Sequence, residues 1–135
     1  MDVDYFKEII ERADPLAEPR IEMIKRVSAT GPRLGVFASS FNPPTVAHVE
    51  LMNRAAEAFT LDEILALACN SNADKLDYEC ELEDRLAMVM LTFADQPRTS
   101  IGLSSRGFYV DMIDALEAVY PRETDLHFIV GFDTF

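Results

Sequence analysis

Hydrophobic positions along the chain alternate between a helical and a strand-like pattern. Apolar residues at helical spacing predict three helices, at Val46–Phe59, Leu82–Phe93 and Tyr109–Tyr120. Short apolar runs predict four strands, at Leu34–Ala38, Glu63–Ala68, Thr99–Leu103 and Leu126–Val130. Strands and helices that alternate in this way indicate an α/β, doubly wound sheet. Because the strands are apolar on both faces, we expect them to be parallel and covered by helices.

The chain before the first of these strands has a different pattern. Apolar residues at helical spacing predict one helix around Tyr5–Ile10 and a second over Ile21–Val27. We therefore expect a helical N-terminal extension, residues 1–32, followed by the main domain, residues 33–135. The expected role of the extension is packing or dimerisation. The main domain has fewer strands than a doubly wound sheet usually has, so we expect the sheet to be incomplete at its C-terminal end.

Charge narrows the range of partners. The net charge of −12, from 24 acidic and 12 basic residues, argues against a broad contact with nucleic acid. It leaves a local phosphate site possible, because helix N-termini bind anions through backbone N–H groups. Cys69 and Cys80 lack the spacing of a metal or redox pair and are expected to be reduced thiols. With neither a signal peptide nor a membrane-spanning apolar run, we expect a cytoplasmic protein.

The segment from Gly35 to His48 carries the candidate chemistry. It joins the first strand of the main domain to a helix, and ligands of open α/β sheets bind at the carboxyl ends of strands. His48 is expected in the first helical turn, where its ring can donate to a phosphate, with the Thr45 hydroxyl on the same side. From position alone, His48 could equally be a polar surface residue.

Ser40-Phe41-Asn42-Pro43-Pro44-Thr45-Val46-Ala47-His48 resembles the signature of the HxGH nucleotidyltransferase superfamily, most closely that of the nicotinate and nicotinamide mononucleotide adenylyltransferases. Three later stretches resemble further motifs of this family, in the same order: Lys75 with Glu83–Met88, Gly107–Leu116 and Phe128–Asp133. The chain departs from the family pattern where Ala38 and Ser39 replace glycines and where no Ser/Thr-x-x-Arg motif follows Asp133.

The resemblance implies a Rossmann-like fold and adenylyl transfer from ATP to nicotinate or nicotinamide mononucleotide, with release of pyrophosphate, in NAD biosynthesis. It places the catalytic residues His48 and Thr45 at the α-phosphate. It implies that ATP and its phosphates are bound by Ser39, Ser40, Phe41, Lys75, Gly131 and Asp133. It implies that the mononucleotide is bound by Asn42, Arg85 and Tyr109. Mg²⁺ is expected as a companion of ATP, with no metal ligand from the protein.

Other interpretations remain open. The chain could be a non-catalytic nucleotide-binding module or an inactive fragment of a longer enzyme. It could also act on another phosphorylated acceptor, as a cytidylyltransferase or a pantetheine-phosphate adenylyltransferase does. Lys75 and Arg85 could be surface residues, and Asp133 could cap a strand. His127 is expected to pack within a strand or at its edge. The expected partners are ATP and a pyridine mononucleotide, with no nucleic acid or membrane, and self-association is left open.

Overall fold

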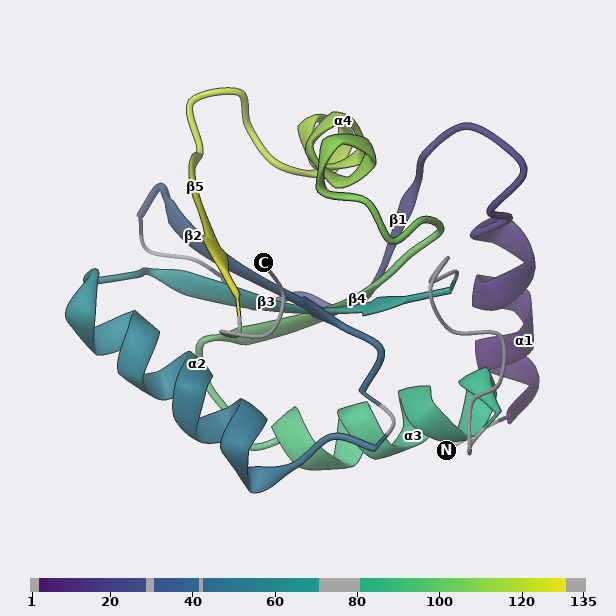
Figure 1. Cartoon of the computed structure of the whole chain (residues 1–135), viewed down its shortest axis with the longest axis horizontal. Coiled ribbons are helices and arrows are strands. Elements are labelled where there is room, and N and C mark those ends of the chain that lie inside the picture. The colour runs from purple at the N-terminus through teal and green to yellow at the C-terminus, as the bar shows by residue number, and fades with distance from the viewer. Residues whose placement is uncertain (1–2, 29–30, 42, 71–80, 131–135) are drawn as a thin grey trace.

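The computed structural model of the chain describes residues 3–28, 31–41, 43–70 and 81–130 (Figure 1). Its five strands form one sheet, in the order β1-β4-β3-β2-β5. In chain order the elements are α1 (Val3–Arg12), β1 (Ile21–Lys25), β2 (Arg33–Ser39), α2 (Val46–Ala58), β3 (Glu63–Cys69), α3 (Leu82–Phe93), β4 (Thr99–Ser104), α4 (Tyr109–Val119) and β5 (Asp125–Ile129). The predicted α/β, Rossmann-like architecture is confirmed.

The strand order reverses at β2. The chain passes from β2 to β3 and then to β4 on one side, and returns to place β5 on the other side of β2. All four of these strands are parallel. The carboxyl end of β2 is therefore the point at which the strand order reverses, and open α/β sheets bind their ligands at such points.

Residues 21–25 contradict the prediction of a second N-terminal helix. They form β1, which pairs antiparallel with β4 and makes the sheet mixed. An apolar pattern over so few residues is compatible with both a helix and a strand. The backbone groups at the edge of β4 need hydrogen-bond partners, and pairing with them favours a strand. The Nζ of Lys25 also donates to the carbonyls of Phe93 (3.1 Å), Ala94 (3.4 Å) and Gln96 (3.1 Å), and so caps the end of α3.

Helices cover both faces of the sheet, with α2 and α3 on one face and α4 on the other (Figure 1). Alternate strand residues enter the two layers, because successive side chains of a strand point to opposite faces. On the face of α2 and α3, the largest fully buried side chains include Ile9, Phe41, Met52, Leu86 and Phe93. On the face of α4 they include Leu34, Leu65, Leu67 and Met112. In the part of the chain that the structure describes, no helix is long and apolar enough to cross a bilayer.

A buried polar cluster lies at the end of the sheet opposite to the carboxyl end of β2. Glu63 begins β3 and is only 4% exposed. Its Oε2 accepts from the hydroxyls of Ser100 (2.7 Å) and Tyr120 (2.6 Å). Burial, together with the neighbouring carboxylate, raises the pKa of Tyr120. The guanidinium of Arg26 lies 4.5 Å from the centre of the Tyr120 ring. The cluster joins β3, β4 and the end of α4, so it fixes how α4 sits on the sheet.

Replacing Tyr120 with Phe removes one donor from the buried Glu63 carboxylate. We expect the free energy of unfolding to fall by about 1–3 kcal/mol, the usual cost of losing a hydrogen bond to a charged group. Urea denaturation measures this loss. Tyr5→Phe is the matched control, since Tyr5 is 44% exposed and should change stability by less than about 0.5 kcal/mol. Equal effects of the two changes would contradict a stabilising role for the cluster.

Candidate functional site

The loop that follows β2 is held in an unusual backbone conformation. Phe41 has a φ of +48°, in the left-handed region that bulky side chains rarely adopt. Its side chain is fully buried, and its ring lies 5.9 Å from Phe37, 5.9 Å from Phe93 and 5.2 Å from His48, measured between ring centres. The Phe41 N–H donates to Ser39 Oγ over 3.2 Å. Packing of the ring therefore maintains a conformation that the backbone alone would not favour.

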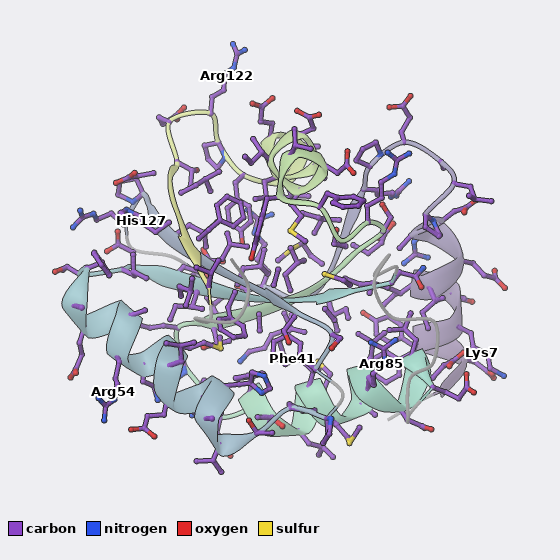
Figure 2. All side chains as sticks on the ribbon, in the orientation of Figure 1. Lys7, Phe41, Arg54, Arg85, Arg122 and His127 are labelled. Atoms are coloured by element: carbon purple, nitrogen blue, oxygen red, sulfur yellow. The ribbon has the colours of Figure 1, made fainter. Side chains whose placement is uncertain are left out.

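Arg85 supports the same loop from α3. Its side chain is buried, with 2% exposure, and Nη1 donates to the carbonyl of Ser40 over 2.8 Å. Figure 2 shows Arg85 and Phe41 on the same side of the sheet, the side of α3. The structure therefore places Arg85 under the loop and excludes the interpretation of Arg85 as a surface residue. Its expected contact with the mononucleotide stays a prediction.

Thr45 and His48 form a capping box at the start of α2. Thr45 is the N-cap residue and His48 occupies the third helical position. The Thr45 N–H donates to His48 Nδ1 over 2.8 Å, and the Thr45 Oγ1 lies 3.0 Å from the same nitrogen. The His48 N–H donates to Thr45 Oγ1 over 3.4 Å, a longer and weaker bond. The two residues thus satisfy backbone donors at the helix N-terminus.

The His48 ring is packed as well as hydrogen-bonded. It meets Phe37 and Phe41 edge to face, with ring centres 5.7 Å and 5.2 Å apart. Burial lowers the pKa of His48 below the ordinary value of 6.5. A neutral imidazole therefore lies in the first turn of α2, at the carboxyl end of β2, where the helix N-terminus favours an anion.

Tyr109 and Cys69 lie at the same end of the sheet, in the core on the face that α4 covers. Tyr109 begins α4, and its ring lies 5.1 Å from that of Phe128. Burial and the nearby Cys69 raise the pKa of Tyr109. Cys69 ends β3, and burial raises the pKa of its thiol to about 12, although the charge of Arg85 opposes that rise. The thiol is therefore protonated at neutral pH and unsuited to act as a nucleophile.

The structure brings together seven of the predicted site residues at one end of the sheet. These are Ser39, Ser40, Phe41, Thr45, His48, Arg85 and Tyr109. The other four, Asn42, Lys75, Gly131 and Asp133, lie outside the described residues. Sequence reasoning did not find the loop contact of Arg85 or the left-handed Phe41. The Thr-x-x-His spacing was a usable signal for the capping box, because it follows the pattern of a capping residue with a hydrogen-bonding partner three positions later.

His127 lies well apart from Phe41, on β5 (Figure 2). Its Nε2 is 3.1 Å from Asp125 Oδ2 on the same strand. Its ring centre is 6.1 Å from that of Phe59. The interpretation of His127 as a strand residue with a packing role agrees with this position. Among the described residues, no three His, Cys, Asp or Glu side chains are grouped to hold a metal ion.

Comparison with known proteins adds a family and several relatives. Residues 36–118 match the family model described as cytidylyltransferase-like. The chain is similar to a probable nicotinate-nucleotide adenylyltransferase of Geobacter sulfurreducens, with 32% identity over 109 residues, 76% of this chain and 50% of that protein. A protein of the same description from Gemmatimonas aurantiaca is 35% identical over 105 residues, 75% of this chain and 50% of its own length. The chain thus spans about half the length of the curated relatives it matches.

Solved structures agree with the fold. One is described as a "putative nicotinate-nucleotide adenylyltransferase" from Vibrio parahaemolyticus, with a TM-score of 0.56, 21% identity, and coverage of 78% of this chain and 64% of that one. Another is the nicotinic acid mononucleotide adenylyltransferase of Plasmodium falciparum in complex with NaAD, with a TM-score of 0.54, 19% identity, and coverage of 73% and 50%. At these identities the likeness concerns the fold alone.

Thr45→Ala tests the capping box. The change removes the Oγ1 cap of α2 and should lower the free energy of unfolding by about 1 kcal/mol, the typical value for loss of an N-cap side chain. Urea denaturation measures the loss. Thr45→Ser keeps a capping hydroxyl and serves as the control. We expect it to change the free energy of unfolding by only about a few tenths of a kcal/mol. A Thr45→Ala protein as stable as the wild type would contradict the capping role.

The partly buried His48 also makes stability depend on pH. Because burial lowers its pKa from 6.5, the folded state binds a proton less readily than the unfolded chain does. The stability that the neutral ring contributes is present above pH 6.5 and is lost as the pH falls through the lowered pKa. We therefore expect the urea midpoint of the wild type to fall more than that of His48→Gln between about pH 7.5 and pH 5.5. Urea midpoints that fall equally in the two proteins would contradict the lowered pKa of His48. His127 is present in both proteins, so its titration affects both midpoints alike.

Proposed function

The chain belongs to the cytidylyltransferase-like family, and from this we propose that it serves adenylyl transfer from ATP to nicotinate mononucleotide, with release of pyrophosphate. The observation that carries the proposal is the position of His48. It stands in the first turn of α2, next to the loop at the carboxyl end of β2. The names of the curated relatives favour nicotinate mononucleotide as the acceptor.

In the proposed reaction, a phosphate oxygen of the mononucleotide attacks the α-phosphorus of ATP. A new P–O bond forms as the bond between the α-phosphorus and the bridging oxygen breaks, and that oxygen leaves with pyrophosphate. No protein nucleophile is needed, which agrees with a Cys69 thiol that burial keeps protonated. The protein then contributes positioning and stabilisation of the charge that develops on the transferring group.

The groups available at the loop suit that role. The N-terminus of α2 carries a partial positive charge from its aligned backbone dipoles. His48 lies in its first turn, and the buried Arg85 adds a full positive charge beneath the loop at Ser40. Together they offer an anion an attractive electrostatic environment in a protein whose net charge is −12.

Mg²⁺ enters this proposal as part of the substrate. The described residues near the loop supply hydroxyls, an imidazole and a guanidinium, and none of these is the carboxylate ligand that Mg²⁺ prefers. ATP phosphates can hold the ion themselves, and the ion neutralises part of the charge of the leaving pyrophosphate. Lys75, Gly131 and Asp133 remain proposed contacts of ATP, and Asn42, Arg85 and Tyr109 remain proposed contacts of the mononucleotide.

Pyrophosphate release tests the function. The chain is incubated with ATP, Mg²⁺ and either nicotinate or nicotinamide mononucleotide. We expect release with nicotinate mononucleotide, and a loss of about 10²- to 10³-fold in kcat for His48→Ala, the usual effect of removing one donor to developing charge.

His127→Ala is the matched control, because His127 is the other histidine of the chain and lies on β5. It should leave the rate within about twofold, as expected of a change away from the reacting groups. ATP binding by calorimetry without any release would contradict adenylyl transfer and favour a nucleotide-binding module. Equal loss in both histidine variants would contradict the assigned role of His48.

A further inference from the structure

Residues 13–20 connect α1 to β1 and lie against the carboxyl ends of β3 and β4 (Figure 1). Asn70 follows β3, and its Nδ2 donates to the carbonyl of Ala13 over 2.7 Å. Ser105 follows β4 and exchanges two hydrogen bonds with Arg20. The Ser105 N–H donates to the Arg20 carbonyl, and the Arg20 N–H donates to Ser105 Oγ, each over 2.9 Å. This connecting segment is therefore attached at both of its ends to the end of the sheet that carries the candidate site.

Ion pairs also hold the two ends of the connecting segment close to each other. Glu22 of β1 lies between two arginines, with its Oε1 3.3 Å from Arg12 Nε and 2.6 Å from Arg20 Nε. Arg12 ends α1, and Arg20 directly precedes β1. Between them, the Ala17 N–H donates to the Asp14 carbonyl over 3.2 Å, which closes a turn. The connecting segment therefore has a defined shape, and the carbonyl of Ala17 has a defined position.

Arg106 joins the connecting segment to α4. Its Nη2 donates to the Ala17 carbonyl over 2.6 Å, and its Nη1 lies 3.7 Å from Asp111 Oδ1, in the first turn of α4. The second distance is that of an ion pair rather than of a hydrogen bond. The two side chains are 33% and 21% exposed, so salt screens this pair less than a fully exposed one. One guanidinium thus connects the N-terminal part of the chain to the helix that Tyr109 begins.

The main chain of Arg106 is anchored as well. Ser104 ends β4 and is 2% exposed. Its hydroxyl donates to the Arg106 carbonyl over 2.6 Å and accepts from the Arg106 N–H over 3.3 Å. Because the family model matches residues 36–118, Arg106 and Asp111 lie inside the matched region and the connecting segment lies outside it. The contact between them is therefore not described by the family likeness.

We propose that Arg106 is a positioning residue, which uses the connecting segment as a fixed support to hold the first turn of α4, and with it Tyr109, in place for the mononucleotide. This inference rests on the proposed function, in which Tyr109 contacts the mononucleotide. The phosphate side of the site has supports of its own, since His48 is held by Thr45 and by the ring of Phe41. Arg106 therefore affects binding of the mononucleotide more than binding of ATP.

Steady-state kinetics of pyrophosphate release separate the two substrates. Arg106→Ala removes both contacts of the guanidinium, and we expect it to raise the KM for nicotinate mononucleotide about tenfold, as loss of a hydrogen bond from a charged group predicts. The KM for ATP should stay within about twofold of the wild-type value. Arg106→Lys keeps the charge and can donate to one of the two partners, so it should recover part of the affinity.

Arg122→Ala is the matched control, because Arg122 is exposed and points away from the protein in the turn before β5 (Figure 2). It should leave both KM values unchanged. An equal rise of the two KM values in Arg106→Ala, or no rise in either, would overturn the inference.

Hydrogen exchange tests the support without any activity. The Met112 N–H is hydrogen-bonded in the first turn of α4, and the Ala17 N–H is hydrogen-bonded within the connecting segment. We expect Arg106→Ala to exchange both amides faster than the wild type, while the amides of β3 keep their wild-type rates. Asp111→Asn removes only the contact with α4 and should speed exchange at Met112 alone. Unchanged exchange at Met112 in Arg106→Ala would overturn the positioning role.

Failure of this inference and failure of the proposed function give different results. If the wild type neither binds nicotinate mononucleotide in calorimetry nor releases pyrophosphate, the proposed function fails, while exchange at Met112 still decides whether Arg106 holds α4. If the wild type is active and exchange at Met112 responds to Arg106→Ala, but the KM for the mononucleotide does not, the inference fails and the proposed function stands.

Discussion

The pairing of β2 with strands on both sides is the constraint on which the site depends. β3 and β5 both run parallel to β2. β5 pairs with β2 as far as Phe37 and β3 as far as Ser39, so the position of the carboxyl end of β2 is fixed by its pairing with β3. The chain leaves that end of β2 between β3 and β5, which lie on opposite sides of it. The loop then turns toward the face of the sheet that α2 covers. Everything that the loop presents to a ligand is therefore placed by the centre of the sheet, where local movement is most costly.

The loop and the helix that follows it are tied down by different kinds of contact. Aromatic packing holds Phe41, a guanidinium holds the Ser40 carbonyl, and a reciprocal capping pair holds His48. These contacts come from β2, α2 and α3, so the site joins two consecutive elements to a helix that is distant in sequence. Support from several elements places a side chain precisely, and in enzymes generally a shift of about 1 Å can cost a hundredfold in rate.

The sequence predicted the main domain well because its signals are long and redundant. Three helices and four strands each carry an apolar pattern, and their alternation allows few arrangements. The strand at Ile21–Lys25 was missed because its identity is set by the free edge of β4 rather than by its own residues. The buried position of Arg85 was also beyond prediction, because a charged residue in an acidic helix start resembles a surface residue until its partner, the Ser40 carbonyl, is known. Phe41 had no local signal, since only the surrounding rings make its backbone conformation tolerable.

The contact between Phe41 and Phe93 links the interior of the protein to the geometry of the site. Phe93 ends α3 and is 1% exposed. Its ring packs against that of Phe41, whose backbone conformation depends on this packing. The size of the side chain at position 93 therefore affects the conformation of the loop as well as the packing of the core. Substitutions that loosened the packing around Phe93 would let Phe41 return to a negative φ. The loop would then change its conformation while the rest of the fold remained intact. Natural variation in activity within such a fold can therefore arise from apolar residues that never meet a nucleotide.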